Sequence, residues 1–321
     1  MNGLSRFFIV GSGRCGSTLL RLMISAHSRI HVTPETQFIV PLVQRLPLHG
    51  TLSHDQMRQA IDIITTDYRW PDMEIDAGDF RRRVAELSRP SLREIIDLVY
   101  RDLLRRSGKA RLGDKSPPYI AIVPQLVALY PKAKFIHLIR DGRDVAISYI
   151  DVRHNTGYYS GERFEWIKAV RRGISYEGSE FASRILDVKY EDLVRNTEAA
   201  LRRICTFLGE TFETGMLDGQ QAIDTLVPKR ELGWHSKLGQ PISENAIGVW
   251  QHKLSGTECF LMESCLHDEL RHLGYPLRFR GAAWQPLLRA TGLGLNRAAP
   301  LLNRAIPALR RRNLLPSGFY I

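Results

Sequence analysis

The sequence predicts an α/β fold in which a parallel sheet is covered by helices on both faces. Three short apolar segments have the length and composition of buried strands, namely 7–10, 135–139 and 185–188. Two amphipathic segments, 91–106 and 198–208, place their apolar residues on one helical face. Buried strands that alternate with such helices are typical of a parallel sheet. Ligands of these sheets bind at the carboxyl ends of the strands, so we expect the functional residues to follow the strands.

A glycine-rich segment follows the first predicted strand. From Gly11 to Thr18 it reads Gly-Ser-Gly-Arg-Cys-Gly-Ser-Thr, and an apolar helical segment begins at Leu19. Backbone N–H groups and the helix dipole converge on an anion in this arrangement, which predicts a phosphate loop. Ser17 stands where nucleoside triphosphatases have the lysine that reaches the terminal phosphates, and this argues against an ATPase or GTPase. Arg14 offers a different cation inside the loop.

The second predicted strand ends at Arg140, in the sequence Arg-Asp-Gly-Arg-Asp. Ser148 follows Arg140 by eight residues, which is about two helical turns, so the guanidinium and the hydroxyl could flank one phosphate. Taken alone, this sequence is more often a solvated charged turn. Beside a phosphate loop at the same sheet edge, it predicts a ligand with two separated phosphates.

The positive charge of the chain is concentrated at its C-terminal end. The net charge is +11, and residues 270–321 contain nine arginines, no lysine and no acidic residue, which leaves +2 for the residues before them. We therefore expect a domain at residues 1–280 and a basic tail at residues 281–321. A nucleic-acid groove mixes cations with stacking aromatics across a folded face, so we do not expect nucleic acid as a partner.

Composition also bears on the cellular compartment. No apolar run approaches the roughly 18 residues that are needed to span a bilayer. The N-terminal residues reach an apolar strand too early to leave room for a signal peptide, and the four cysteines are far apart. We expect a cytoplasmic protein with reduced thiols. The histidine and cysteine spacings predict no metal site.

Taken in order, the motifs resemble the sulfotransferases that use 3′-phosphoadenosine 5′-phosphosulfate (PAPS), and most of all the tyrosylprotein sulfotransferases and their bacterial relatives. The segment from Gly13 to Thr18 resembles their 5′-phosphosulfate loop, and residues 139–148 resemble their 3′-phosphate motif. Further matches are Pro34-Glu35-Thr36, Asp114-Lys115-Ser116-Pro117 and Tyr190-Glu191-Asp192-Leu193-Val194, with a weaker one at Gly248-Val249-Trp250. The resemblance implies a P-loop-type α/β fold with a helical insertion on the acceptor side, PAPS as the donor and no metal.

The resemblance also implies which residues bind the donor. The loop residues implied to hold the 5′-phosphosulfate are Arg14, Cys15, Gly16, Ser17 and Thr18. Arg140 and Ser148 are implied to hold the 3′-phosphate, and Tyr190 is implied to contact the adenine or the ribose. A loop that closes over the nucleotide is matched by a segment that contains Ser236 and Lys237.

Three residues are implied to carry the chemistry. Glu35 is implied to be the general base, and for this role we expect a partly buried carboxylate with a raised pKa. Lys115 and Arg14 are implied to neutralise the charge that grows on the leaving oxygen. By composition alone, Glu35 would instead be a glutamate at a helix start, and Lys115 a surface lysine.

Two positions depart from the family pattern. The tyrosylprotein sulfotransferases follow their glutamate with arginines that receive acidic peptides, whereas residues 36–41 contain no cation. We therefore expect the acceptor to be the hydroxyl of a lipid, a glycan or a small molecule rather than an acidic protein tyrosine. Val249 stands where the family often has a lysine, and the missing contact would come from Lys253 or Lys237.

The sequence thus predicts an enzyme that transfers a sulfuryl group from PAPS to a hydroxyl acceptor. Two alternatives stay open, namely a P-loop small-molecule kinase and a non-catalytic basic adaptor for membranes or nucleic acid. A kinase would bind ATP with Mg²⁺ more tightly than the product nucleotide of PAPS. An adaptor would keep its partner after the loss of Glu35 and Lys115.

The tail allows two interpretations. Four arginines recur at spacings of seven or eight with leucines between them, namely Arg289, Arg297, Arg304 and Arg311. This pattern is typical of a helix that lies on an anionic membrane, although Pro300 and Pro307 favour short helical segments. The alternative is a pair of helices packed on the catalytic domain with the arginines in water. The membrane interpretation predicts a peripheral location at the inner membrane surface.

Overall fold

The computed structural model describes residues 6–153, 162–222 and 242–280, together with residues 291 and 294. The described residues form two compact units. Unit 1 contains residues 6–11, 16–138, 176–222 and 242, and unit 2 contains residues 12–15, 139–153, 162–175 and 243–280. The basic tail expected at residues 281–321 lies outside the described residues, apart from Thr291 and Gly294.

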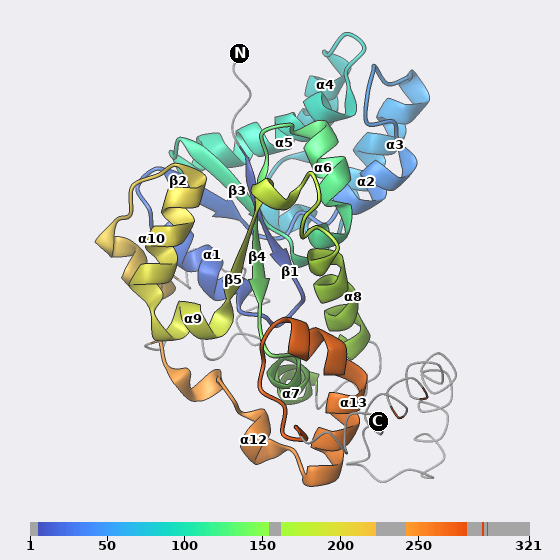
Figure 1. Ribbon diagram of the computed structural model, residues 1–321. Coiled ribbons are helices and arrows are strands. Elements are labelled where there is room, and N and C mark those ends of the chain that lie inside the picture. The colour runs from blue at the N-terminus through green and yellow to red at the C-terminus, as the bar shows by residue number, and fades with distance from the viewer. Residues whose placement is uncertain (1–5, 154–161, 223–241, 281–290, 292–293, 295–321) are drawn as a thin grey trace. The chain divides into compact units, whose positions relative to one another are not determined.

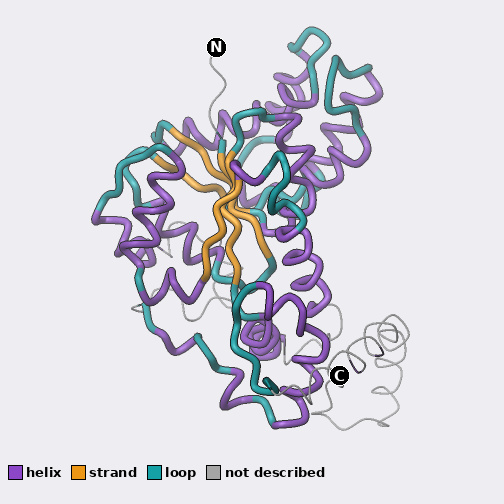
Figure 2. Tube along the Cα trace, in the orientation of Figure 1, coloured by secondary structure: helices purple, strands orange, loops and turns teal. Residues whose placement is uncertain are grey.

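A five-stranded sheet forms the centre of unit 1, with the strand order β2-β3-β1-β4-β5. Its strands are β1 (Phe7–Gly11), β2 (Ile30–Thr33), β3 (Arg111–Lys115), β4 (Lys134–Ile139) and β5 (Ile185–Lys189). β1 pairs in parallel with β3 and with β4, and β3 pairs in parallel with β2. Figure 2 shows the strands in orange. The three strands predicted from apolar runs are confirmed, whereas the sequence did not predict β2 and β3.

Unit 1 contains α-helices that pack on the sheet and others that pack on those helices (Figure 1). They are α1 (Ser17–Ser25), α2 (Ile39–Arg45), α3 (His54–Thr65), α4 (Ala77–Ala85), α5 (Leu92–Ser107), α6 (Val123–Leu129), α9 (Tyr190–Arg195) and α10 (Thr197–Leu208). Short 3₁₀ helices are η1 (Trp70–Met73), η2 (Pro117–Ile122), η3 (Ala182–Arg184) and η4 (Thr214–Ala222). Figure 1 shows α1 and α10 on one side of the sheet and α5 and α6 on the other. Both helices predicted from the periodicity, 91–106 and 198–208, are confirmed as α5 and α10.

Local sequence explains where α5 begins and ends. Ser91 and Glu94 form a capping box, in which each side chain accepts a hydrogen bond from the backbone N–H of the other residue. The helix ends at Ser107, and its C-cap residue, Gly108, has a φ of 65° in the left-handed region that glycine tolerates best. The segment between β2 and β3 contains α2, α3, η1, α4 and α5, which agrees with the expected helical insertion.

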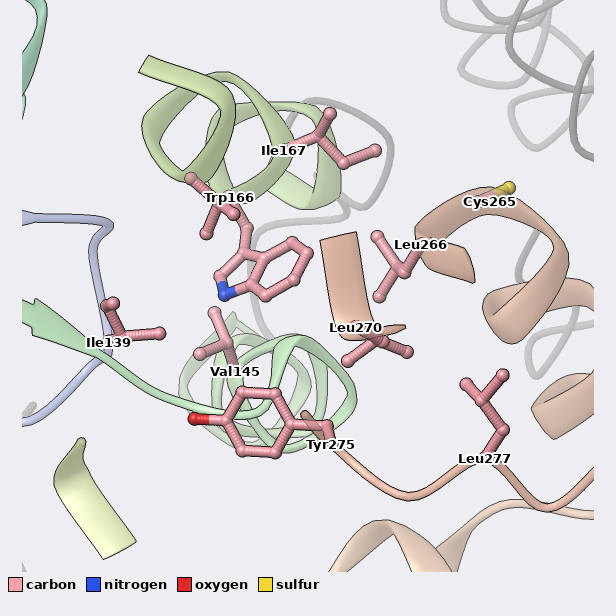
Figure 3. Close-up of a cluster of buried hydrophobic side chains, with 10 residues drawn as sticks. Ile139, Val145, Trp166, Ile167, Cys265, Leu266, Leu270, Tyr275 and Leu277 are labelled. Carbon is pink, nitrogen blue, oxygen red and sulfur yellow. The ribbon is translucent and has the colours of Figure 1, made fainter. Parts of the chain in front are cut away.

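Unit 2 has a core of its own, built from α7 (Gly142–Arg153), α8 (Glu162–Ile174), η6 (Glu244–Ala246), α12 (Trp250–Lys253) and α13 (Gly256–His272). Trp166 of α8 is fully buried and packs with Val145 of α7 and Leu266 of α13 (Figure 3). Its indole Nε1–H donates a hydrogen bond to the carbonyl oxygen of Arg140 at 3.0 Å. The backbone that follows β4 is thereby anchored to the core of unit 2. Among the described residues, no helix combines the length and apolar character needed to cross a bilayer.

Candidate active site

The phosphate loop joins β1 to α1. Its backbone is left-handed at Arg14, with a φ of 60°, and at Gly16, with a φ of 94°. Left-handed residues in a short loop are typical of the backbone nests that bind anions. Helix α1 begins at Ser17, and its N-cap residue, Gly16, has no side chain that could cap the first-turn N–H groups. The helix N-terminus therefore presents backbone donors at the carboxyl end of β1.

Two positions of this loop require glycine. A Cβ atom at Gly13 would collide with the hydroxyl of Tyr149, and one at Gly16 would collide with the ring of Tyr190. Tyr190 begins α9 directly after β5 and is buried. Each ring thus lies against loop backbone in its own unit, Tyr149 in unit 2 and Tyr190 in unit 1. A loop without side chains at these points lets its backbone approach a ligand closely.

Three of the predicted donor-binding side chains lie together in unit 2. The Arg14 Nε–H donates a hydrogen bond to the Ser148 hydroxyl at 3.1 Å. Arg140 donates from Nη1 to the carbonyl oxygen of Arg14 at 3.0 Å and from Nη2 to the carbonyl oxygen of Ala246 at 2.6 Å. The structure therefore brings the first strand's loop and the Arg140 motif together, as the sequence predicted from their positions at one sheet edge.

Cys15 differs from its neighbours in the loop. Its side chain is fully buried, and its thiol contacts the carbonyl oxygen of Ser12 at 2.8 Å. Cys15 therefore stabilises the loop from inside. Its backbone N–H, rather than its thiol, is the group suited to contact a phosphate.

The remaining charged residues of the Arg140 motif are structural. Arg143 is fully buried, contacts Asp141 at 2.7 Å and Glu263 at 2.5 Å, and lies 3.6 Å from the ring centre of Trp250. Asp144 accepts hydrogen bonds from the backbone N–H groups of Gly248 and Trp250, at 2.7 and 3.0 Å. These contacts hold the Gly248-Val249-Trp250 segment against the start of α7. The sequence interpretation missed this role because the partners are about a hundred residues apart.

Glu35 and Lys115 meet in unit 1, although they are 80 positions apart. Lys115 ends β3, and Glu35 lies in the loop that follows β2, so the parallel β2–β3 pairing brings the two segments together. The Lys115 ammonium donates a hydrogen bond to Glu35 Oε1 at 2.7 Å. The Lys115 side chain is only 4% exposed and that of Glu35 is 17% exposed. Lys115 is therefore a buried ion-pair partner and not the surface lysine that composition alone would favour.

A buried network fixes the backbone on both sides of this pair. The carboxylate of Asp114 accepts hydrogen bonds from the hydroxyls of Tyr100 at 2.5 Å, of Ser116 at 2.7 Å and of Thr36. The Ser116 hydroxyl in turn accepts a hydrogen bond from the Thr36 backbone N–H at 3.1 Å. Burial raises the pKa of Asp114 to about 6, even though the hydroxyl donors act in the opposite direction. The network locks the Pro-Glu-Thr segment to the end of β3.

The second carboxylate oxygen of Glu35 has partners that the sequence did not reveal. Gln37 donates to Glu35 Oε2 at 2.7 Å, and the Arg69 guanidinium lies 3.5 Å from the same oxygen. Arg21 of α1, which is buried, donates from Nε to the carbonyl oxygen of Val32 at 3.0 Å and adds positive charge near Glu35. No periodicity or motif marks Arg69, which lies in the irregular segment before η1.

These neighbours decide the charge of Glu35. Burial alone would raise the pKa of Glu35, but the attraction and hydrogen bond of Lys115, followed by Arg69 and Gln37, outweigh it and lower the pKa from 4.5 to about 2. The expectation of a raised pKa for Glu35 is therefore wrong for this structure. The sequence could not show that two cations from separate segments contact one carboxylate.

Two other predicted contacts stay untested. Ser236 and Lys237 lie outside the described residues. Lys253 ends α12 and is exposed, and nothing in the structure assigns it the contact of the lysine that Val249 replaces.

Comparison with known proteins adds an independent line of information. A model of the sulfotransferase family matches residues 6–214. Protein-tyrosine sulfotransferase A of Caenorhabditis elegans is 25% identical over 276 residues, which are 84% of this chain and 66% of that protein. The protein-tyrosine sulfotransferase of Drosophila melanogaster is 24% identical over 259 residues, which are 78% of this chain and 47% of that protein. The chain thus spans about half to two thirds of the length of these two relatives.

A solved structure shows the same fold. The sulfotransferase domain of the Synechococcus olefin synthase superposes with a TM-score of 0.62 at 23% sequence identity. The superposition covers 84% of this chain and 94% of that domain. The predicted α/β architecture therefore agrees with both the strand order and this likeness.

Proposed function

Because the chain belongs to the sulfotransferase family, we propose that it transfers a sulfuryl group from PAPS to a hydroxyl acceptor and releases 3′-phosphoadenosine 5′-phosphate (PAP). The observation that carries this proposal is the buried contact of Lys115 with Glu35 at 2.7 Å. This ion pair joins a cation and a carboxylate at the carboxyl ends of β3 and β2, in the same unit as the N-terminus of α1, and so supports the proposal. Transfer of an anionic group to a hydroxyl needs these three elements.

The loop fits the anionic donor. Gly13 and Gly16 lack the Cβ atom that would collide with the Tyr149 and Tyr190 side chains. The first-turn N–H groups of α1 are suited to bind a phosphosulfate. We assign the 5′-phosphosulfate to the loop residues Arg14, Cys15, Gly16, Ser17 and Thr18. In unit 2, we assign the 3′-phosphate to Arg140 and Ser148, whose contacts with Arg14 bring two cationic groups together.

Two assignments concern the nucleoside end of the donor. Tyr190 is assigned to the adenine or the ribose because its ring lies against the loop backbone at Gly16. Ser236 and Lys237 are assigned to the segment that closes over the nucleotide, on the resemblance alone.

The proposed mechanism uses Glu35 as the base. PAPS, when bound, supplies a sulfuryl group on a good leaving phosphate. Glu35 accepts the proton of the acceptor hydroxyl, so that the oxygen can attack sulfur. Lys115 and Arg14 neutralise the negative charge that grows on the phosphate oxygen as its bond to sulfur breaks.

The ion pair of Lys115 and Glu35 affects how strong a base Glu35 is. While Lys115 contacts Glu35, the carboxylate is a weak base, because its pKa is lowered to about 2. When the Lys115 ammonium turns toward the developing charge of the leaving group, Glu35 loses its strongest cationic partner. The pKa of Glu35 then rises, because burial favours the protonated form. The base thus gains strength when the donor engages Lys115.

We propose a lipid, glycan or small-molecule hydroxyl as the acceptor, rather than an acidic protein tyrosine. Residues 36–41 contain no cation. Arg69, which supplies positive charge beside Glu35 instead, already faces two carboxylates, those of Glu35 at 3.5 Å and Asp72 at 3.4 Å. An acidic peptide would therefore find this charge largely balanced.

We also propose a cytoplasmic location with peripheral contact to an anionic membrane through the basic tail. This rests on the arginine pattern of residues 281–321 and on the net charge, most of which residues 270–321 carry. Neither nucleic acid nor a metal ion is part of the proposed reaction.

Nucleotide binding tests the activity class. Isothermal titration with PAP in the presence of a chelator is compared with titration by ATP and Mg²⁺. We expect PAP to bind more tightly, whereas a small-molecule kinase would show the reverse order.

Transfer itself is tested with labelled PAPS. The wild-type protein is incubated with labelled PAPS and a lysate or lipid extract of the source organism, and the labelled product is identified. Lys115→Ala should abolish most of the labelling, while Lys168→Ala, at an exposed position in α8, should leave it unchanged. Equal labelling by both variants would contradict the role of Lys115.

A further inference from the structure

Arg69 occupies an unusual position for a residue in an irregular segment. It lies between α3 and η1 and is only 5% exposed. Its Nη2 lies 3.5 Å from Glu35 Oε2, and its Nη1 donates to Asp72 Oδ2 at 3.4 Å. Its Nε–H donates to the hydroxyl of Tyr68 at 3.1 Å. The Arg69 guanidinium therefore contacts both the exposed side chain of Tyr68 and the carboxylate of Glu35.

The backbone around Arg69 is held firmly. Its own N–H donates to Asp67 Oδ1 at 2.7 Å. Trp70 and Met73, the first and last residues of η1, are buried, and the Trp70 ring packs against Phe80 of α4 with ring centres 5.3 Å apart. The Arg69 side chain thus extends from a fixed backbone position toward Glu35.

The two oxygens of Glu35 meet different kinds of partner. Oε1 faces Lys115, which must leave the carboxylate if it is to stabilise the leaving group. Oε2 faces Gln37 and Arg69. Arg69 also contacts Asp72 and Tyr68, so its position does not depend on Glu35 alone.

We propose that Arg69 is a positioning residue that holds Glu35 by Oε2 and leaves Oε1 as the atom that accepts the acceptor's proton. This inference rests on the proposed function and deepens it. In the step, the acceptor O–H bond breaks and its proton goes to Glu35 Oε1, while the acceptor oxygen forms a bond to sulfur. The bond between sulfur and the phosphate oxygen of the donor breaks, and its electron pair leaves with PAP.

Charged groups from three parts of unit 1 surround Glu35. α1 contributes Arg21, β3 contributes Lys115 and Asp114, and the segment at η1 contributes Arg69 and Asp72. Lys115 is the largest of the influences that lower the pKa of Glu35, and Arg69 is the next cation in order of effect. Once Lys115 turns to the donor, Arg69 is the remaining cation in contact with the carboxylate among the described residues. It therefore sets how strong a base Glu35 becomes.

The test measures the pKa of Glu35 directly, in a protein in which Lys115 has been replaced and no longer lowers that pKa. Carboxyl-labelled glutamate is followed by carbon NMR in Lys115→Met, and the Glu35 signal is assigned by its loss in Glu35→Gln. Adding Arg69→Gln should raise the pKa of Glu35 by about one unit, the usual effect of losing an adjacent opposite charge. Adding Arg69→Lys should restore part of this shift.

Arg82→Gln in the same Lys115→Met protein is the matched control, because the Arg82 side chain is 69% exposed and pairs with Asp79 on the surface of α4. It should leave the pKa of Glu35 unchanged. An equal pKa in the Arg69→Gln and Arg82→Gln proteins overturns the inference. This measurement needs no donor or acceptor, whereas failure of the wild-type protein to bind PAP would overturn the proposed function.

A second readout leaves Arg69 in place, in case Arg69→Gln does not fold. The Nε–H resonance of Arg69 is followed by nitrogen NMR in Lys115→Met and assigned by its loss in Arg69→Lys. We expect this resonance to shift with the same midpoint as the Glu35 carboxyl signal. A resonance that does not respond to the Glu35 titration overturns the inference.

Discussion

At the scale of single residues, the proposed chemistry of this protein depends on the partners of Glu35. Lys115 contacts one carboxylate oxygen at 2.7 Å, while Gln37 and Arg69 contact the other at 2.7 and 3.5 Å. In the proposed mechanism, the same carboxylate is a stable ion-pair member at rest and a base during the reaction. The proposal assigns this change to a movement of the Lys115 ammonium rather than to a movement of Glu35.

Replacing the base should affect turnover and spare donor binding. Glu35→Gln keeps the shape of the side chain but cannot accept the proton, so we expect turnover to fall by ~10²-fold or more. The affinity for PAP, measured by calorimetry, should change little. Near-normal transfer to the acceptor found in the lysate or lipid extract would remove Glu35 from the mechanism.

The lowered pKa of Glu35 also predicts how stability depends on pH. The folded protein binds this proton less readily than the unfolded chain, because the pKa falls from 4.5 to about 2 on folding. Ionised Glu35 therefore stabilises the fold fully above the unfolded value of 4.5, and this contribution is lost as the pH falls toward 2.

Urea unfolding at a series of pH values tests whether the stabilisation by Glu35 is lost on acidification, as this account predicts. The difference in free energy of unfolding between wild type and Glu35→Gln should be largest above about pH 5 and should shrink as the pH is lowered. Glu165→Gln, at an exposed position of α8, is the control and should show little effect at any pH. A difference that grows on acidification would contradict the electrostatic account.

The assignment of Arg140 to the 3′-phosphate is tested by comparing two donors. Arg140→Ala removes a charge-assisted phosphate contact of about 1.5 to 3 kcal/mol, roughly tenfold to a hundredfold in affinity for PAPS. Adenosine 5′-phosphosulfate lacks that phosphate and should lose much less affinity. Arg172→Ala, exposed on α8, is the control. An equal loss for both donors would show that Arg140 acts only through its hydrogen bonds to the carbonyls of Arg14 and Ala246.

At the scale of elements, β1, the phosphate loop and α1 follow one another along the chain as strand, turn and helix. The loop can turn tightly because Gly16 adopts a φ of 94° and has no Cβ to meet the Tyr190 ring. The turn brings the first-turn N–H groups of α1 to the end of β1. The contact with Tyr190 joins this element to the start of α9.

Substitution of Gly16 separates two physical effects. Gly16→Ala combines a left-handed backbone with a collision, whereas Gly108→Ala, at a φ of 65°, meets nothing within 4 Å. The left-handed backbone alone costs about 1–2 kcal/mol, so we expect this loss for Gly108→Ala and a larger one for Gly16→Ala. Urea unfolding measures both variants, and only Gly16→Ala should also weaken PAP binding. Equal stabilities would show that the Tyr190 ring moves aside without effect.

At the scale of the whole molecule, the two units are stabilised in different ways. The core of unit 1 is a sheet covered by helices, whereas unit 2 contains the Trp166 cluster (Figure 3). Unit 2 also contains the buried ion network of Arg143, Asp141 and Glu263. Glu263 also accepts hydrogen bonds from the backbone N–H groups of Arg278 and Phe279. This network fixes the chain just before the basic tail begins.

The tail is tested by vesicle co-sedimentation. If it contacts a membrane, the full chain should sediment with anionic vesicles at low salt more than a chain that ends at Arg280. Each arginine near the surface adds about 1 kcal/mol, and binding should weaken as salt screens the charges. Equal sedimentation of the two chains would favour the alternative, in which the tail packs on the catalytic domain, and would remove the argument for a membrane-bound acceptor.

Local sequence predicted some elements and missed others for physical reasons. β1 is a continuous apolar run and β4 is mostly apolar, and the short length of both favours a buried strand. β3 reads Arg-Leu-Gly-Asp-Lys and has no such pattern, yet it is buried because it lies between β1 and β2. Its polar residues are tolerated because Asp114 and Lys115 find partners on other segments. Those partners cannot be read from a window of five residues.

The sequence by itself determined the glycine-rich loop, the flanking strand and helix, and the family, because each of these depends on short motifs whose own residues are contiguous in the chain. It also named Glu35 and Lys115 as a candidate base and cation by resemblance. Only the tertiary structure decided that they contact one another, that Arg69 lies beside them, and that the pKa of Glu35 falls rather than rises. The direction of such a shift depends on the balance between burial and the distances to charged groups, and these distances exist only once separate segments have folded together.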